Sequence, residues 1–128
     1  MHKSVAVITS RLPAIAADIL SETFNVVSHE GDLGRSEDDL ITIFSEADGV
    51  ITVLTDPVTR RVLESNPNLR IVANCAAGTS NIDLTAAREL GVTVTNTPGV
   101  LTETAMARIA ATNVKVMLTG GLPPNVVV

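Results

Sequence analysis

The chain is poor in aromatic and sulfur-containing side chains. Its 128 residues include no Trp, no Tyr, two Phe and one cysteine. A single cysteine cannot form an internal disulfide, which fits a reducing compartment, and we expect a cytoplasmic protein. Because Cys75 closes an apolar stretch, we expect it to be a buried, inert thiol and not a nucleophile.

Basic residues and long apolar segments are also scarce. Nine Lys and Arg stand against 14 Asp and Glu, which gives a net charge of −5, whereas nucleic-acid binding needs clustered cations to neutralise phosphates. No segment offers the ~20 apolar residues of a membrane-spanning helix. Residues 4–9 are too short for the apolar core of a signal peptide. We therefore expect neither a nucleic-acid partner nor a membrane partner.

The glycines are not spaced as in a nucleotide-binding turn. They stand at 31, 34, 49, 78, 91, 99, 120 and 121. This spacing contains neither a Gly-x-Gly-x-x-Gly turn nor a Gly-x-x-x-x-Gly-Lys phosphate loop, so we expect no bound nucleotide cofactor. We also expect no metal, because a hard divalent cation needs several oxygen ligands and only Asp56 offers a carboxylate near a predicted strand end.

What the chain does contain is a regular alternation of strand and helix patterns. Short apolar runs predict strands at 4–9, 24–27, 50–54, 69–74 and 92–95. Amphipathic spacing predicts helices between them, beginning at Pro13 and after the N-cap Ser36, and spanning 58–65, 84–90 and 103–118. The last helix is expected to turn one apolar face inward, namely Met106, Ile109, Ala110, Val114 and Met117.

This alternation predicts an α/β fold. Five strands separated by helices imply right-handed crossovers and a parallel sheet that is covered on both faces. We expect a flavodoxin-like three-layer α/β/α sandwich with strand order 2-1-3-4-5. With no internal repeat and no linker, residues 1–128 are expected to form a single domain. Ligands of such a sheet collect beyond the carboxyl ends of its strands.

One of these strand ends has the composition of an anion-binding turn. Ala76, Ala77 and Gly78 follow the strand predicted at 69–74. Small residues allow successive backbone N–H groups to turn toward a ligand, and such a concavity suits a carboxylate. The simpler interpretation is that Gly78 only permits a tight turn between a strand and a helix, and these residues taken alone favour it.

Two longer stretches resemble a known enzyme family. Residues 74–83 read Asn-Cys-Ala-Ala-Gly-Thr-Ser-Asn-Ile-Asp and residues 90–98 read Leu-Gly-Val-Thr-Val-Thr-Asn-Thr-Pro. They are similar to the substrate-binding domain of D-2-hydroxyacid dehydrogenases, most closely the glyoxylate/hydroxypyruvate reductase branch. The resemblance implies that the amides of Ala77 and Gly78 hold the carboxylate of a small 2-keto or 2-hydroxy acid, and that Leu54 packs against it. Family members often carry glycine in place of Ala76, and a larger or acidic pair in place of Thr79-Ser80.

The same resemblance implies that the middle of the enzyme is missing. In the family, the segment matching 100–103 leads into a complete nucleotide-binding domain, whereas here residues from about 105 to 128 resemble the C-terminal segment. We expect an isolated, engineered substrate domain with its N-terminal part at 1–103 and a join near Glu103–Met106. The intact parent would reduce glyoxylate or hydroxypyruvate with NADH or NADPH. No residue here matches the family's catalytic His, its orienting carboxylate or its substrate-clamping Arg, so we expect no catalytic residue and no activity.

Other interpretations remain open. One is a structural module that binds no ligand. A phosphoacceptor receiver would use Asp56, although Asp56 before Pro57 is more simply a turn residue, and would need an acidic pair where Thr9-Ser10 stand. An FMN-binding flavodoxin would need exposed aromatic residues, whereas Phe24 and Phe44 are predicted core residues. Loss of a partner domain would also bare apolar surface, so self-association is expected.

Overall fold

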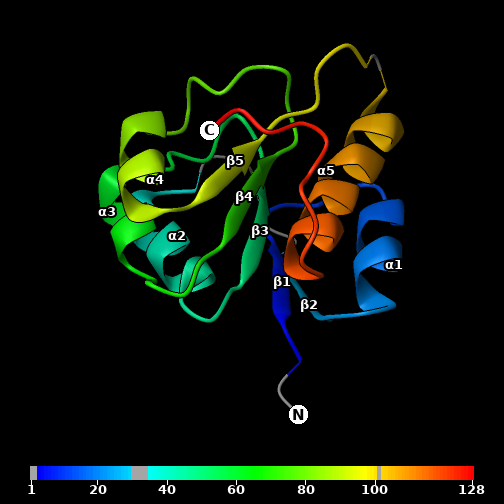
Figure 1. Ribbon diagram of the computed structural model, residues 1–128, viewed down its shortest axis with the longest axis horizontal. Coiled ribbons are helices and arrows are strands. Elements are labelled where there is room, and N and C mark those ends of the chain that lie inside the picture. Colours follow the sequence, from blue (N-terminus) through cyan, green and yellow to red (C-terminus); the bar gives the residue numbers. More distant parts are fainter. Residues whose placement is uncertain (1–2, 30–34, 101) are drawn as a thin grey trace.

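The expected parallel sheet is present in the computed structural model, which describes residues 3–29, 35–100 and 102–128. Gly31, Gly34 and Leu101 lie outside the described residues. The five strands follow the predicted order β2-β1-β3-β4-β5 (Figure 1). They are β1 (Val5–Ile8), β2 (Asn25–Ser28), β3 (Gly49–Thr52), β4 (Ile71–Asn74) and β5 (Thr93–Thr95). The parallel register pairs Thr52 with Asn74, so the carboxyl ends of the central strands meet at one edge.

Helices cover both faces of this sheet. The first face carries α1 (Ile15–Ser21) and α5 (Glu103–Leu118), which pack against each other, and the second carries α2 (Glu37–Phe44), α3 (Arg60–Glu64) and α4 (Leu84–Leu90) (Figure 1). Every residue of β3 and β4 is buried because alternate side chains enter the two apolar layers. The fold is therefore the flavodoxin-like α/β sandwich that the sequence predicts. Among the described residues, no helix is both long and apolar enough to span a bilayer.

The predicted helix signals at Ser36 and Gly91 are confirmed. The Asp39 N–H donates to Ser36 Oγ over 3.1 Å, and the Ser36 N–H donates to the Asp39 carboxylate over 3.3 Å. This reciprocal pair satisfies two donors that the first turn of α2 would otherwise leave free. Gly91 ends α4 with φ of 74°, a left-handed conformation that favours glycine.

The helix predicted over 58–65 begins later than expected. Thr59 is extended and caps α3, which starts at Arg60. Val58 instead forms a parallel bridge with Ile82, in which the Val58 N–H donates to Asn81 O over 2.8 Å and the Asp83 N–H donates to Val58 O over 2.9 Å. This bridge joins the loop after β3 to the loop after β4, a long-range pairing that local periodicity does not reveal.

The buried face of α5 also differs from the prediction. Ala110 and Val114 are buried as expected, but Met106, Ile109 and Met117 are only half-buried. Small residues line the contact, and the fully or nearly buried positions include Ala107, Ala110, Ala111, Val114 and Leu118. A Cβ added at Gly49 would lie 3.0 Å from Val114 Cγ1. The alanines and this glycine thus let α5 approach the sheet more closely than large side chains would allow.

The C-terminal segment lies along β5, which the sequence did not predict. Val126 forms an antiparallel bridge with Thr95, and the Val127 N–H donates to Val94 O over 2.7 Å. The Val94 N–H in turn donates to Val128 O over 3.0 Å. The segment, red in Figure 1, runs beside β5, the outermost strand on this side of the sheet, and forms hydrogen bonds with backbone groups of that strand.

Candidate functional site

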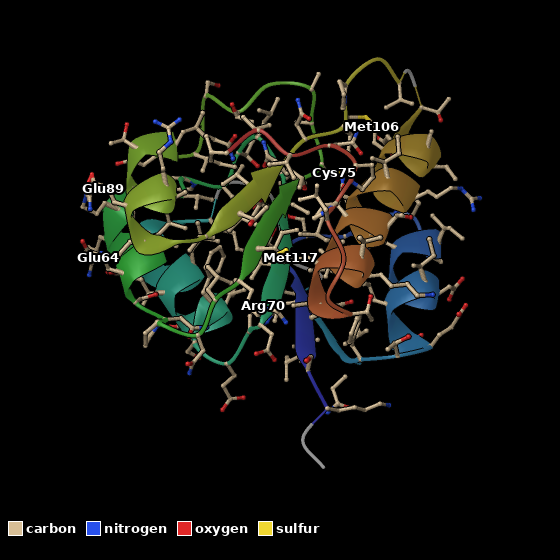
Figure 2. All side chains as sticks on the ribbon, in the orientation of Figure 1. Glu64, Arg70, Cys75, Glu89, Met106 and Met117 are labelled. Atoms are coloured by element: carbon tan, nitrogen blue, oxygen red, sulfur yellow. The ribbon has the colours of Figure 1, made fainter. Side chains whose placement is uncertain are left out.

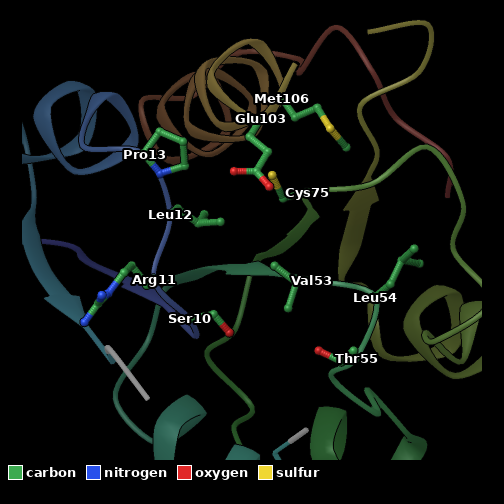
Figure 3. Close-up of a pocket in the computed structure, with 10 residues that line it drawn as sticks. All are labelled: Ser10, Arg11, Leu12, Pro13, Val53, Leu54, Thr55, Cys75, Glu103 and Met106. Carbon is green, nitrogen blue, oxygen red and sulfur yellow. The ribbon is translucent and has the colours of Figure 1, made fainter. Parts of the chain in front are cut away.

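The loops that follow the central strands enclose a cavity at the carboxyl edge. Its volume is about 390 Å³, and it lies between the loop after β1, the loop after β3 and the first turn of α5 (Figure 3). Figure 2 places Cys75 and Met106 at this end of the molecule and Arg70 toward the other end. The wall is mostly apolar and includes Leu12, Val53, Leu54 and Met106. Leu54, a predicted site residue, therefore lies in the cavity wall and is 51% exposed.

Ala77 and Gly78 lie on the exposed loop after β4. The cavity wall reaches Cys75, two residues earlier in the chain, but does not include Ala77 or Gly78. The structure thus places Leu54 and the Ala77-Gly78 loop at the same edge, with Cys75 between them in sequence.

Three successive carbonyl groups of this loop are held by the scaffold. Ala76 O accepts the Thr97 N–H over 2.9 Å, and Ala77 O accepts the Asn96 side-chain amide over 3.0 Å. Gly78 O accepts the Asn74 side-chain amide over 3.0 Å. These three bonds fix the orientation of the three peptide planes that begin at Ala76, Ala77 and Gly78.

The N–H groups of the same peptides point away from those partners. In a trans peptide the N–H is directed opposite to the carbonyl, so the N–H groups of Ala77, Gly78 and Thr79 face the other way. None of the three donates to a protein acceptor within residues 3–29, 35–100 and 102–128. These adjacent N–H groups on the exposed loop, called the cradle below, are therefore not used by the protein, and backbone N–H groups are the donors that bind anions in such turns.

Gly78 is not required by the turn in which it lies. Its φ is not positive, and a Cβ added to it would meet no atom within 4 Å. The simpler interpretation of Gly78, that only glycine permits the turn, is therefore weakened. A side chain at position 78 would extend into open space.

A pair of asparagines connects the two loops, and sequence reasoning missed its role. Asn74 donates its side-chain amide to Asn81 Oδ1 over 2.9 Å, and Asn81 donates its own amide to Val53 O over 3.1 Å and to Asp56 O over 3.0 Å. Asn81 therefore holds both sides of Leu54. The signal in the sequence was two amide side chains on either side of the small residues 76–78.

Asp56 is a turn residue, as predicted, but it is also fully buried. Its carboxylate accepts the Thr9 hydroxyl over 2.5 Å and the Val53 N–H over 3.0 Å. A phosphoacceptor must be reachable by a phosphate donor, so this burial argues against the receiver interpretation. Among the described residues no cluster of His, Cys, Asp and Glu could hold a metal ion.

The flavodoxin interpretation is also unsupported. Phe24 and Phe44 are both buried, so neither ring is available to stack on a flavin. The turn after β1 reads Ser10-Arg11-Leu12-Pro13. It contains no glycine, and Pro13 has no N–H to offer, so this turn presents fewer backbone donors to the phosphate of FMN than a glycine-rich turn would.

Cys75 is half-buried, where full burial was expected. Burial raises the pKa of the Cys75 thiol from 9.0 to about 11, and the charge of the Glu103 carboxylate contributes in the same direction. Figure 3 shows the two side chains together at the cavity. The thiol stays protonated at neutral pH, which is the unreactive form.

Comparison with known proteins relates this chain to an enzyme family. The family model "D-isomer specific 2-hydroxyacid dehydrogenase, catalytic domain" matches residues 6–106. A glyoxylate reductase of Korarchaeum cryptofilum is 38% identical over 97 residues, which is 76% of this chain and 29% of the relative. A glyoxylate reductase of Aeropyrum pernix is 42% identical over 88 residues, which is 69% of this chain and 26% of the relative.

Solved structures show the same relationship. The TT0316 protein of Thermus thermophilus matches with a TM-score of 0.71 and 32% identity, over 90% of this chain and 36% of that chain. The 3-phosphoglycerate dehydrogenase of Entamoeba histolytica, solved with bound NAD+, matches with a TM-score of 0.68 and 26% identity, over 77% of this chain and 34% of that chain. The chain therefore spans less than a third of the length of the two reductases and little more than a third of these solved chains.

Proposed function

Because this chain belongs to the D-isomer specific 2-hydroxyacid dehydrogenases and corresponds to their catalytic domain, we propose that it binds a small 2-keto or 2-hydroxy acid. The N–H groups of Ala77 and Gly78 hold the carboxylate of the acid, and Leu54 packs against its carbon atoms. One observation carries this proposal: the carbonyls of three successive peptides are bonded to the scaffold while their N–H groups have no protein acceptor in the described part of the chain.

The chemistry of the cradle suits a carboxylate better than a neutral group. Hydrogen bonds to a charged acceptor are about twice as strong as those between neutral groups. The peptide planes are already held in place by Thr97, Asn96 and Asn74. Little conformational freedom is therefore lost when the acid binds. The exposed Leu54 side chain would shield the ligand from water on one side.

The proposed substrate of the intact parent is glyoxylate or hydroxypyruvate, reduced with NADH or NADPH. This assignment is supported by the names of the two reductases described above and by the NAD+ bound to the Entamoeba protein. The sequence contains no Gly-x-Gly-x-x-Gly turn, and no residue here matches the family's catalytic His or clamping Arg. The chain on its own is therefore expected to bind the acid without reducing it.

We also infer that the chain was engineered by joining two segments of such a parent near Glu103–Met106. The family match ends at residue 106. The likeness to TT0316 covers 90% of this chain, which is more than residues 1–106 can supply. Part of the segment after residue 106 therefore also resembles the family fold, which supports a direct connection between an N-terminal and a C-terminal piece.

Titration with oxalate, followed by amide chemical shifts in NMR, tests the proposed function. The largest shifts should occur at the N–H groups of Ala77 and Gly78, with a Kd of about 1 mM, or roughly 4 kcal/mol of binding free energy. Oxamide, which has the same shape without the charge, is the matched control and should leave both amides unchanged. Shifts confined to other loops would remove the proposal, and no shifts at any amide would favour the module that binds no ligand.

Absorbance of NADH in the presence of glyoxylate tests the expected inactivity. The chain should consume no NADH above the rate in buffer, because it supplies neither a general acid nor a cofactor turn. Measurable turnover by the purified chain would mean that the catalytic groups have been misjudged.

A further inference from the structure

We propose that Asn81 is a positioning residue for the carboxylate site, acting through its amide pair with Asn74. The inference rests on the function proposed for Ala77, Gly78 and Leu54, and adds the group that aligns these residues. Asn81 itself does not contact the acid. It ties the backbone around Leu54, in the loop after β3, to the Gly78 peptide of the cradle in the loop after β4.

Asn81 holds the Leu54 loop closed. The Asn81 side-chain amide donates to Val53 O over 3.1 Å and to Asp56 O over 3.0 Å. These carbonyls lie on either side of Leu54, so one amide group closes the loop that presents this side chain. Only an NH₂ group can donate to two carbonyls at once in this position, which also settles which way the amide points.

Asn74 connects the hydrogen bonds of Asn81 to the cradle. Asn81 Oδ1 accepts the Asn74 amide over 2.9 Å, and the same Asn74 amide donates to Gly78 O over 3.0 Å. Asn74 is itself fully buried at the end of β4. Its Oδ1 accepts the Thr52 hydroxyl over 2.8 Å at the end of β3. The orientation of the Gly78 peptide is thus tied, through two amides, to the backbone around Leu54.

This connection has a consequence for binding. A loop held in its binding conformation loses little freedom when a ligand arrives, whereas a loop released from its anchors must be ordered at the expense of affinity. If the Asn81 amide is removed, the Val58–Ile82 bridge still joins the two loops, but the backbone around Leu54 loses its connection to the Gly78 peptide. The affinity for the acid should then be lower than in a variant that is equally destabilised but keeps this connection.

Asn66 offers a matched control at the other end of the sheet. Like the half-buried Asn81, it donates its amide to two carbonyls, here Phe44 O over 2.7 Å and Ala47 O over 2.8 Å, and it is itself buried. Removal of this amide should destabilise the fold at least as much. Asn66 contacts neither substrate loop, so a purely structural role for both asparagines predicts the same binding result at both positions.

The experiment compares Asn81→Ala with Asn66→Ala in oxalate titrations followed by NMR and in urea unfolding. We expect Asn81→Ala to weaken oxalate binding about tenfold, while Asn66→Ala leaves it within about twofold of the original chain. Before oxalate is added, the Gly78 amide and Leu54 methyl signals should shift or broaden in Asn81→Ala alone. Unchanged oxalate affinity in folded Asn81→Ala, or equal weakening in Asn66→Ala, would overturn the inference.

A second variant keeps the test decisive if Asn81→Ala does not fold. Thr52→Val retains the shape of the side chain and removes only the hydrogen bond to Asn74 Oδ1. It should weaken oxalate binding in the same direction, by about threefold, and unchanged affinity would contradict the inference. Failure of the unsubstituted chain to bind oxalate would instead contradict the proposed function, and with it this inference. Binding by the unsubstituted chain with no effect of Asn81→Ala would overturn the positioning role alone.

Discussion

The amino edge of the sheet, where the parallel strands begin, and the carboxyl edge, where they end, differ in how fully their polar side chains are hydrogen-bonded. At the amino edge the buried Asn66 uses its amide and its oxygen in three hydrogen bonds, and the half-buried Asp48 carboxylate accepts the Val5 N–H over 2.7 Å. At the carboxyl edge, beyond or at the ends of the strands, lie all the buried side-chain atoms that lack a hydrogen-bond partner within the described residues. These are Ser10 Oγ, Asp56 Oδ1, Thr95 Oγ1 and Thr97 Oγ1.

This difference indicates which edge is built for stability and which is available for binding. Buried polar groups in folded proteins almost always have partners, so unpaired groups gathered at one edge need an explanation. The Ala77 and Gly78 N–H groups of the cradle lie at this same edge. A parallel sheet collects its ligands there. The carboxyl edge therefore carries the unused hydrogen-bonding capacity that a ligand needs, and the described part of the amino edge has no such unpaired side-chain atom.

The largest expected effect is a loss of stability at the amino edge. Asn66→Ala removes the donor to Phe44 O and Ala47 O, and carbonyls left buried with fewer partners should lower the free energy of unfolding by about 2–3 kcal/mol. Urea unfolding measures this loss. A decrease in the unfolding free energy of less than about 0.5 kcal/mol would mean that the hydrogen bonds of Asn66 contribute little to stability, and would contradict the comparison with the carboxyl edge.

The next effect concerns the reactivity of the cavity wall. Since the pKa of Cys75 is raised from 9.0 to about 11, alkylation by iodoacetamide at pH 8 should be about 100-fold slower than that of an unperturbed thiol. Urea should restore the rate by removing burial, and Glu103→Gln should raise it slightly. A rate equal to that of an exposed thiol would contradict the burial of this wall.

The same pKa shift makes a prediction about stability and pH. Because folding favours the protonated thiol, the contribution of Cys75 is present below about pH 9 and is lost as the pH rises through about 11. The unfolding free energy should therefore fall less steeply over this range in Cys75→Ala. Identical slopes for the two proteins would count against the raised pKa.

A smaller loss of stability is expected at the carboxyl edge. Asp56→Ala removes the acceptor of the Thr9 hydroxyl and the Val53 N–H, but it also removes Oδ1, which is buried without a partner among the described residues. These effects oppose each other, so the unfolding free energy should fall by about 1.5 kcal/mol, less than for Asn66→Ala. A larger loss than that of Asn66→Ala in the same urea experiment would reverse the comparison between the edges.

The smallest effect is self-association, which we propose to arise at the carboxyl edge. Leu54 is 51% exposed there, whereas Leu90, 42% exposed, lies at the far end of α4. Sedimentation at high concentration should show weak association that Leu54→Gln reduces and Leu90→Gln does not. A clean monomer at every concentration would remove this proposal.

Much of the fold could be predicted from the sequence because its signals are local. The apolar strands, the capping box at Ser36 and the glycine stop at Gly91 depend on residues a few positions apart, and each is present. The features that were missed depend on distant residues: Val58 pairs with Ile82, and the C-terminal segment pairs with β5. The inward face of α5 was predicted only in part: Ala110 and Val114 are buried, but alanines at 107 and 111 are buried where Met106 and Ile109 were expected, because small residues allow the close approach of this helix to the sheet.

The candidate site was predicted only in part for the same reason. Ala77, Gly78 and Leu54 could be named from a family resemblance, and these assignments remain predictions. The roles of Asn74 and Asn81 could not be read from composition, since an asparagine near a turn is ordinarily a turn residue. Only the folded chain brings their amides to the carbonyls of the two loops.

A crystal structure of the chain with oxalate tests the central claim most directly. We predict that one carboxylate of the oxalate lies with its oxygens about 2.8–3.0 Å from the backbone nitrogens of Ala77 and Gly78. Leu54 should contact the carbon atoms of the same ligand. Oxalate bound elsewhere, or Ala77 and Gly78 N–H groups already bonded to protein acceptors in the crystal, would contradict it.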